Sequence, residues 1–298
     1  MKGVNPKLYP FQSHFETIGG HQYHYVEQGK GETVVFLHGN PTWSFYYREL
    51  IQKLSPYFHC LAPDHIGCGY SDKPDDEDYA YTLEQRVKDL EEFLEKKGIN
   101  KNIHLVVHDW GGIIGMAYAH RHPKSIKKIV LMNTAAFHLP KSKRFPFVLW
   151  LVRTWLGAFA VRGFNAFSGI ATVEGTKRIN LPKDVRQGLT APYNSWKNRI
   201  ATLRFVQDVP LKPSDRGYDL ITEMENNLNQ FRNTPTLIAW GMKDFVFDKY
   251  ILNTWEKYLP EARVYRFEDS GHYILEDQQE VIGQLVLDFF NEETNGKL

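Results

Sequence analysis

Short apolar runs rich in β-branched residues recur over the first 137 residues of the chain and again from about residue 235. Runs of this length, bounded by turn-forming residues, are typical of buried strands rather than helices. Apolar residues at helical spacing in 83–97 and 111–120 predict helices between such runs. We interpret six of the runs as strands, at 33–37, 59–62, 103–107, 128–132, 236–240 and 263–267.

The alternation of strands and helices predicts the fold class. Strands separated by helices form a mostly parallel, doubly wound sheet, because each crossover helix returns the chain in the same direction. The segment 15–28 differs, since Gly19 and Gly20 interrupt it between two short runs. That pattern predicts an antiparallel hairpin at the sheet edge. We therefore expect an α/β fold with a mostly parallel sheet.

The alternation stops between about residues 138 and 215. This stretch is rich in Trp, Phe, Arg and Asn, and we interpret it as several helices joined by Pro-containing loops. A separate domain is the alternative, but the sheet pattern resumes afterwards, which favours an insertion between two strands. We expect a core built from 1–137 and 216–298, with a helical lid, 138–215, over the active-site end.

The composition is that of an ordinary globular protein. Of the 298 residues 42% are apolar and 24% charged, and the formal net charge is +1, so nothing indicates a nucleic-acid binder. Two cysteines, Cys60 and Cys68, are too few for a disulfide framework or a metal site. We expect no metal, no cofactor and a cytoplasmic location. The start has no apolar stretch of signal-peptide type, and Arg153 and Thr154 interrupt the longest apolar run, 145–161, so no transmembrane segment is expected.

The most informative motif is VHDWGG at 107–112, directly after a buried strand and before a helix. A sharp strand-to-helix turn flanked by small residues is where α/β-hydrolases hold their nucleophile. Asp109 takes the position that serine usually holds. Gly111 meets the need for a small residue, while Val107 is larger than usual. An aspartate before a helix is also a common N-cap, and this motif alone would favour the N-cap.

A second motif, HGNP at 38–41, follows a predicted strand. In this fold that loop supplies one backbone N–H of the oxyanion hole, and the residue after the nucleophile supplies the other. Those donors would be Asn40 and Trp110. A plain turn containing Asn and Pro is the alternative. It does not explain why the loop falls at this place in the strand order.

The third signal is Gly271-His272, after the last predicted strand and before the C-terminal helix. A lone histidine is usually structural, but the order nucleophile, acid, base along the chain is the order this fold requires. Asp244 follows the preceding strand and is our choice for the acid, with Asp248 as the runner-up. The end of an earlier strand holds Asn133, which cannot be a charged partner for an imidazolium.

A Gly-rich turn, PDHIGCGYSDKP at 63–74, follows another predicted strand. No Gly-Lys-Ser/Thr follows it, so it is not a phosphate cradle. We interpret it as structural support behind the active-site loops. Cys68 within it has no histidine placed to activate it and is predicted to be a buried thiol.

An aspartate nucleophile indicates a class of reaction. A carboxylate suits substitution at saturated carbon and gives an alkyl-enzyme ester, whereas serine suits acyl transfer. Asp109 must be ionised to attack. Burial raises its pKa, and the backbone donors and the positive end of the following helix oppose that shift. The leaving group carries negative charge, and the side chains of Asn40 and Trp110 are the obvious donors for it.

Together HGNP, HDWGG, GMKD and GHYILED resemble the haloalkane dehalogenase family over nearly the whole chain. The resemblance implies that Asp109 is the nucleophile, His272 the base and Asp244 the acid, with Asn40 and Trp110 as the anion-binding pair. Longer strings resemble one subgroup, the β-lactone decarboxylases of bacterial long-chain olefin biosynthesis. Several of these strings fall inside the lid, the part that normally varies most. The strings are HGNPTWSFYYR, PDHIGCGYSDKP, LMNTAAF, FNAFS, APYNSWKNRI and RFVQDVPL.

This subgroup resemblance implies a cis-β-lactone substrate with two long alkyl chains, converted to a cis-alkene and carbon dioxide. It also implies assembly with the lactone-forming synthetase of the same pathway. The residues permit that chemistry. Asp109 would attack the ring carbon bearing oxygen, releasing a carboxylate held by Asn40 and Trp110, and anti elimination of carbon dioxide would then expel Asp109. His272 would tune the charge at Asp109 and hydrolyse any stalled ester.

Large apolar residues crowd one segment of the lid, and basic residues flank it. The apolar residues are Phe145, Phe147, Trp150, Leu151, Trp155 and Phe159, and the basic ones are Lys141, Lys143, Arg144, Arg153 and Arg162. We expect packing of the lid on the sheet core to account for most of the apolar side chains. A peripheral membrane or partner contact is the lesser alternative.

Other functions stay open at this point. Hydrolytic haloalkane dehalogenation needs no residue that is missing. An epoxide hydrolase needs two lid tyrosines, and Tyr193 is the one convincing candidate. A non-catalytic ligand-binding sensor usually lacks one catalytic member, whereas here every member is present. A cofactor-free oxygenase would show oxygen uptake with an aromatic heterocycle.

Overall fold

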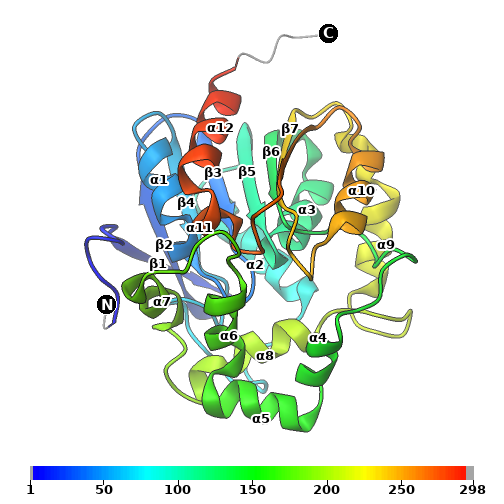
Figure 1. Cartoon of the computed structure of the whole chain (residues 1–298). Helices are drawn as coiled ribbons and strands as arrows, with labels where there is room; N and C mark the ends of the chain where they lie inside the picture. Colours follow the sequence, from blue (N-terminus) through cyan, green and yellow to red (C-terminus); the bar gives the residue numbers. More distant parts are fainter. Residues whose placement is uncertain (1–2, 293–298) are drawn as a thin grey trace.

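An eight-stranded sheet runs through the centre of the molecule (Figure 1). The computed structural model describes residues 3–292, so residues 1–2 and 293–298, at the outer ends of the two expected core segments, lie outside the described range. The strands lie in the order β1-β2-β4-β3-β5-β6-β7-β8. Their bounds are β1 Ser13–Ile18, β2 His21–Gln28, β3 Thr33–Leu37, β4 His59–Pro63, β5 Ile103–His108, β6 Ile126–Met132, β7 Thr236–Gly241 and β8 Arg263–Phe267.

The pairing directions confirm the predicted class. β1 pairs antiparallel with β2, and β2 with β4, while every neighbouring pair from β4 to β8 is parallel. The hairpin at 15–28 therefore lies at the sheet edge as predicted, with Gly19 and Gly20 at positive φ in its turn. All six predicted strands are present. β3 and β8 have the predicted bounds, and the other four extend by one or two residues.

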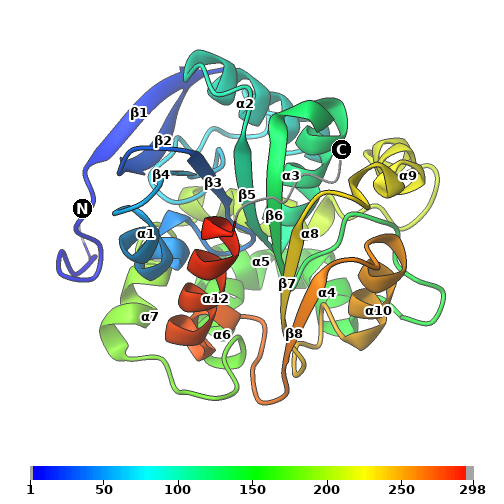
Figure 2. The same ribbon diagram turned by 90° about the horizontal axis from the view of Figure 1, so that it is seen from above.

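Helices cover both faces of the sheet (Figure 2). Side chains alternate between two apolar cores, so that in β3 Val35 and Leu37 enter one core while Val34 and Phe36 enter the other. Because both faces are covered, every residue of β5 and of β7 is buried, as is typical of parallel strands. One face carries α1 Arg48–Leu54 and α12 Gln279–Asn291, and the other carries α2 Leu83–Lys96, α3 Trp110–Arg121, α9 Tyr218–Asn226 and α10 Lys249–Tyr258.

Short helical segments join these elements. They are α11 Ile274–Asp277 and the 3-10 helices η1 Ser44–Tyr47, η2 Pro123–Ser125, η3 Lys197–Arg199 and η4 Leu228–Phe231.

Both cysteines are free and buried, as predicted for Cys68, and burial raises the pKa of each thiol to about 12.

Between β6 and β7 five helices gather at one end of the sheet (Figure 1). They are α4 Phe147–Val152, α5 Trp155–Phe164, α6 Ala166–Glu174, α7 Lys183–Thr190 and α8 Ile200–Gln207. Asn165, at φ 54°, ends α5 and starts α6 in a left-handed conformation. Within 3–292 no single helix is long and apolar enough to cross a bilayer, and α5 and α6 meet that requirement only as a pair, bent by 80°. Residues 138–215 remain our proposed lid.

The aromatic segment of the lid is not packed as predicted. Phe147 is 71% exposed and Trp155 78%, and Trp150, Leu151 and Phe159 are also exposed, while Phe145 is half-buried. No residue of α4 is buried. These helices turn one side toward a cavity, and their other side stays open within the described residues. The expectation that packing on the sheet accounts for most of these side chains is wrong.

Candidate active site

Asp109 lies at the turn between β5 and α3, in a backbone conformation that few residues adopt. Its φ is 52° and its ψ −126°. Strain of this kind persists only where the surroundings enforce it. Here the Asp109 N–H donates to the Asn133 carbonyl at 3.1 Å, and the Thr134 hydroxyl donates to the Asp109 carbonyl at 2.6 Å. The side chain makes no capping hydrogen bond to α3, so it is free of the N-cap role that the motif alone would favour.

Two glycines let the backbone pass close to this turn. A Cβ atom on Gly39 would lie 2.1 Å from Oδ1 of Asp109, and one on Gly111 would lie 1.8 Å from the Leu37 carbonyl oxygen. Neither position tolerates a side chain, because real Cβ atoms do not approach other atoms so closely. The glycines of HGNP and HDWGG are therefore required by the geometry around the Asp109 carboxylate.

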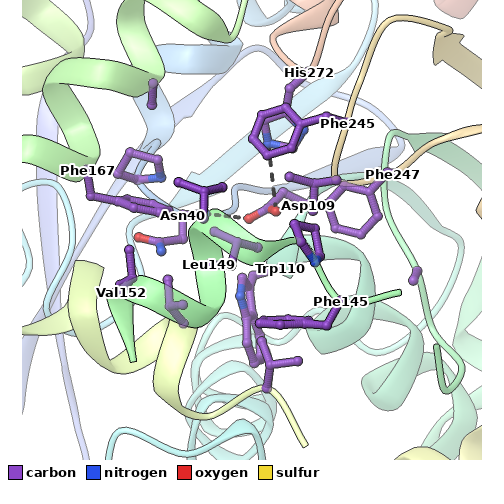
Figure 3. A pocket seen from close by; sticks show the side chains of 18 of the residues that line it. Asn40, Asp109, Trp110, Phe145, Leu149, Val152, Phe167, Phe245, Phe247 and His272 are labelled. Carbon is purple, nitrogen blue, oxygen red and sulfur yellow. Dashed lines mark hydrogen bonds and ion pairs between the residues drawn. The ribbon is translucent and has the colours of Figure 1, made fainter. Parts of the chain in front are cut away.

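His272 lies between the carboxylates of Asp109 and Asp244, and Figure 3 shows it facing Asp109. Its Nε2 is 3.7 Å from Oδ2 of Asp109, and its Nδ1 is 2.7 Å from Oδ2 of Asp244. Oδ1 of Asp244 accepts from the backbone N–H groups of Val246 and Phe247, at 2.7 and 3.1 Å. These bonds fix the carboxylate, which in turn fixes the orientation of the imidazole. The structure thus brings together the three residues that we predicted as nucleophile, base and acid.

Asp248, the runner-up for the acid, is placed elsewhere. Its carboxylate caps α10 by accepting from the Tyr250 N–H at 3.0 Å, and it pairs with Nζ of Lys143 at 2.7 Å. Asp244, in contrast, is fully paired at the histidine. The geometry therefore favours Asp244 over Asp248 as the partner of His272.

Asn133 clamps the ends of β6 and β7 beneath the triad. Its Nδ2 donates to the Gly241 carbonyl at 3.1 Å and to Oδ2 of Asp244 at 3.0 Å, and its Oδ1 accepts from the Gly241 N–H at 2.8 Å. Three bonds from one buried amide hold Asp244 at the correct distance from the histidine. The sequence excluded Asn133 as an acid but gave no sign of this role, because Gly241 is more than a hundred residues away.

Burial and charge shift the pKa of all three groups. Burial raises the pKa of Asp109 above its ordinary value, although His272 and the backbone N–H groups of Asn40 and Trp110 oppose the shift. Burial also acts to raise the pKa of Asp244, but His272 and the two backbone donors outweigh it and leave that pKa lowered. Burial acts to lower the pKa of His272, and the two carboxylates outweigh it, so the pKa of the imidazole is raised. The two carboxylates therefore favour the protonated form of His272.

Backbone donors already hold the nucleophile. The Asn40 N–H donates to Oδ1 of Asp109 at 2.6 Å, and the Trp110 N–H stabilises the same carboxylate. The side-chain amide of Asn40 donates to the Thr202 carbonyl at 3.0 Å, while its Oδ1 has no hydrogen-bond partner among the described residues. The Thr202 carbonyl fixes which amide atom is nitrogen, because reversal would set two oxygens against each other. One amide hydrogen remains for a ligand.

The triad faces a cavity of about 370 Å³ whose walls are mostly apolar. Asn40, Asp109, Trp110 and His272 line its floor, and its other walls include side chains from α4, α5 and α6 together with Phe145, Phe245 and Phe247 (Figure 3). No tyrosine of the described residues lines it. Tyr193, the candidate for epoxide hydrolysis, is fully buried and donates to the Thr42 carbonyl. Such a cavity suits an apolar ligand with one polar, reactive centre.

A buried cation lies behind Trp110, and no motif predicts it. The guanidinium carbon of Arg86 is 3.8 Å from the ring centre of Phe205 and 5.8 Å from that of Trp110. Arg86 is fully buried and pairs with Asp208 at 3.5 Å, and burial raises the pKa of Asp208 to about 6 although Arg86 opposes that shift. Its guanidinium nitrogens make no hydrogen bond within the described chain. Positive potential behind the indole favours an anion in front of it.

The Gly-rich turn at 63–74 supports the site from behind, as interpreted. The buried Asp64 carboxylate accepts from the Ser44 and Tyr70 N–H groups and from Nδ1 of His24, at 2.7 to 2.9 Å. Burial acts to raise the pKa of Asp64, but His24 and these donors lower it well below its ordinary value. Among the described residues, no cluster of His, Cys, Asp and Glu has the makeup of a metal site.

Comparison with known proteins gives three findings. Residues 32–279 match the family model described as the alpha/beta hydrolase fold. Two relatives are named cis-3-alkyl-4-alkyloxetan-2-one decarboxylase. The one from Shewanella oneidensis is 53% identical over 286 residues, covering 96% of this chain and 90% of that protein. The one from Xanthomonas campestris is 46% identical over 266 residues, covering 87% and 88%. The solved haloalkane dehalogenase DbeA from Bradyrhizobium elkani USDA94 superposes with a TM-score of 0.83 at 26% identity, covering 94% of this chain and 97% of that one.

Proposed function

The chain is an enzyme of the α/β-hydrolase fold family, in the branch that contains haloalkane dehalogenases and cis-3-alkyl-4-alkyloxetan-2-one decarboxylases, and on that premise we propose that it decarboxylates cis-3,4-dialkyl β-lactones to cis-alkenes and carbon dioxide. One observation carries the proposal furthest. The Asp109 carboxylate lies at the floor of an apolar cavity, held by two backbone donors and beside two further donors.

The first step that we propose is substitution at carbon. An Oδ atom of Asp109 attacks the ring carbon that bears the ring oxygen, with inversion, and forms an alkyl ester. The carbon–oxygen bond of the ring breaks, and its electron pair leaves as a carboxylate. The remaining amide hydrogen of Asn40 and the indole N–H of Trp110 would hold that carboxylate, with the Arg86 charge behind it.

The second step is elimination. The bond between the carboxylate carbon and the neighbouring ring carbon breaks, and its electron pair becomes the π bond of the alkene. The bond from carbon to Asp109 breaks in the same step, which returns the electron pair to the Asp109 carboxylate. Carbon dioxide and the alkene leave, no water is consumed, and inversion followed by anti elimination turns a cis ring into a cis-alkene.

His272 has no proton to transfer in this cycle. The carboxylates of Asp244 and Asp109 raise its pKa, and a protonated imidazole next to Asp109 would stabilise that carboxylate when it is free and again when it is expelled. Attack on the lactone carbonyl is the alternative first step. It would require hydroxide to leave from the resulting β-hydroxy acid, and hydroxide is a poor leaving group.

Hydrolytic dehalogenation is the second candidate function. The same Asn40 and Trp110 donors would hold a halide, and His272 would activate water against the ester. The two relatives of highest identity reported above favour a lactone substrate, because both are named decarboxylases. The sequence identity to the solved dehalogenase structure is only 26%.

The proposal is tested by turnover of a cis-dialkyl β-lactone beside a bromoalkane of matched length, with Asp109→Ala as the control. We expect alkene from the lactone and little bromide release, and neither product from the variant. Fast bromide release with an inert lactone would assign the enzyme to the dehalogenases. An active alanine variant would remove Asp109 from its proposed role.

We further propose that the reaction belongs to long-chain olefin biosynthesis, and that the enzyme assembles with the synthetase that closes the lactone ring. A β-lactone is strained and reactive, so transfer between adjacent enzymes would limit its loss to water. Co-elution of the two purified enzymes on size exclusion tests the assembly, and separate elution at micromolar concentration would count against it.

A further inference from the structure

Exposed apolar side chains concentrate on the proposed lid. Fourteen of the nineteen exposed large hydrophobic residues in the described chain belong to 138–215. Ring contacts join Phe147 to Trp150 and Phe159 to Phe164, and α5 packs on both α4 and α6, so the exposed side chains lie on neighbouring helices. Exposed apolar side chains gathered in this way mark a contact site. We call this surface the lid face and define it as Phe147, Trp150, Trp155, Leu156, Phe159 and Phe164.

Charge is segregated in the same segment. Residues 138–215 hold thirteen of the 36 Lys and Arg residues but four of the 35 Asp and Glu residues. The segment therefore has a net charge of +9, whereas the rest of the chain totals −8. Within 3–292 only four of the thirteen form an ion pair, namely Lys143, Lys177, Arg178 and Arg204. The other nine form no ion pair in the described chain. Four of these nine, Arg153, Arg162, Arg186 and Arg199, donate to backbone carbonyls instead.

Three exposed apolar side chains of α4 and α6 also line the cavity. Val148, Leu151 and Ile170 line the cavity and are also 46%, 43% and 57% exposed. Val148 and Leu151 belong to α4, which also carries Phe147 and Trp150 of the lid face, and Ile170 belongs to α6. An alkyl chain could therefore pass from an apolar medium against the lid face to the cavity floor along apolar side chains.

We infer that the lid face docks on the surface of a bilayer that contains anionic phospholipid. Trp and Phe side chains enter the boundary between headgroups and acyl chains, and unpaired Lys and Arg side chains contact anionic headgroups. The contact that we infer is peripheral, with the side chains of the lid face entering the headgroup boundary. The benefit to catalysis rests on the proposed function, because a dialkyl lactone and its alkene dissolve in acyl chains far better than in water.

Vesicle sedimentation with the full-length protein tests the docking. Phosphatidylcholine vesicles are compared with vesicles that also contain phosphatidylglycerol, at low and at high salt. We expect binding to the anionic vesicles to exceed binding to the neutral ones by about tenfold and to fall with salt. Brominated acyl chains should quench tryptophan fluorescence, because Trp150 and Trp155 are exposed on the lid face.

Matched variants locate the contact. Phe147→Ser with Trp155→Ser should lower vesicle affinity by about tenfold or more, because both side chains leave water on docking. Phe15→Ser with Tyr57→Ser is the control, since these side chains are similarly exposed but lie on β1 and after α1.

Charge variants give a second pair. Lys141→Gln with Arg144→Gln should weaken binding to anionic vesicles alone, and Lys101→Gln with Lys124→Gln on the core should not. None of the eight substituted residues lines the cavity, so turnover of a short, water-soluble lactone should be unchanged in every variant.

Three outcomes would overturn the inference. The first is that the protein binds neither vesicle type. The second is that the lid-face and control variants lose vesicle affinity equally. The third is that the protein binds no vesicles but binds itself or another protein, and that this protein contact is lost when Phe147 and Trp155 are substituted. Binding requires no turnover, so Asp109→Ala should dock like the unaltered enzyme. Failure of the proposed decarboxylation would leave that result intact, and failure of docking would leave the turnover assay intact.

Discussion

Most residues of helix α3, behind Asp109, are buried, whereas few residues of helices α4 to α6, over the cavity, are buried. Nine of the twelve residues of α3 are buried, and a Cβ at Gly112 would collide with the Thr134 side chain. In α4 no residue is buried, in α5 only Val161 is, and in α6 only Ser168 and Thr172 are. The core thus fixes the reacting groups through close packing and paired polar atoms. The lid supplies an apolar wall whose outer side faces away from the protein.

This contrast means that substitutions in the two regions should change different properties. Core residues near the triad should affect chemistry and folding, and lid-face residues should affect neither. The largest effect is expected at the nucleophile. Asp109→Ala should lower turnover by at least about 10⁴-fold, because no ester can form. Steady-state alkene production measures it. Asp248→Asn, which alters a carboxylate outside the triad, is the matched control and should keep most of the activity.

The next largest effect is expected when His272, the proposed base, is substituted. The loss of turnover should depend on the substrate. In His272→Gln, the low bromoalkane turnover expected of the unaltered enzyme should fall by a further factor of about 10² to 10⁴, with the alkyl ester of Asp109 accumulating, because water is no longer activated. Lactone turnover should fall less, since elimination needs no water. Mass spectrometry of the intact protein during turnover separates the two cases. An equal fall for both substrates, with a trapped ester from the lactone, would indicate hydrolysis in both.

The pH dependence follows from the raised pKa of Asp109. A carboxyl with a raised pKa binds a proton at a higher pH, so activity should be lost as the pH falls through that value. The loss should approach tenfold per pH unit and begin above the ordinary aspartate pKa of about 3.9. A kcat/KM profile with a short lactone measures it. An acid limb at or below the ordinary value would show that His272 and the backbone donors outweigh burial.

A smaller difference between the two regions is expected in the free energy of unfolding. Asn133→Ala removes three buried hydrogen bonds, among them the one that the Gly241 N–H donates to Oδ1 of Asn133, so unfolding free energy should fall by about 3 kcal/mol. Urea denaturation measures the change. Asn133→Asp is a harder test of the clamp, because it keeps the size but sets a carboxylate against Asp244.

The smallest effect is expected on the lid face. Trp155→Ser should change the free energy of unfolding by less than about 0.5 kcal/mol, because the side chain is 78% exposed and ordering it gains little. The same denaturation experiment compares it with Trp240→Ala in β7, a fully buried residue that should cost about 3 to 5 kcal/mol. A cost above 2 kcal/mol for Trp155→Ser would mean that the lid face is packed against protein.

The sequence predicts the sheet, and it predicts that Asp109, Asp244 and His272 come together, because both depend on local signals. Strand periodicity, the glycines around Asp109 and the place of His272 after the last strand are all readable from neighbouring residues. Contacts between distant segments are not. The clamp from Asn133 to Gly241 and the hydrogen bond from Asn40 to Thr202 each join residues more than a hundred positions apart.

The burial of side chains in the proposed lid is harder to predict from the sequence, for a different physical reason. Helices α4 to α6 are apolar on more than one side, so hydrophobicity alone cannot tell the side that faces the cavity from the side that faces out. Phe167 lines the cavity and Phe164 is 75% exposed, although they are three residues apart. The burial of each depends on the left-handed turn at Asn165. An Asn within a run of apolar residues does not by itself predict a break between two helices.

The central claim is that Asp109 adds to the substrate and leaves again without water. Turnover in ¹⁸O-labelled water, followed by mass spectrometry of the peptide that contains Asp109, tests it most directly. Water that attacks the ester carbonyl places ¹⁸O in the Asp109 carboxylate, whereas elimination leaves it unlabelled. We predict an unlabelled peptide after many turnovers of the lactone. Incorporation of ¹⁸O into Asp109 during those turnovers would contradict the account.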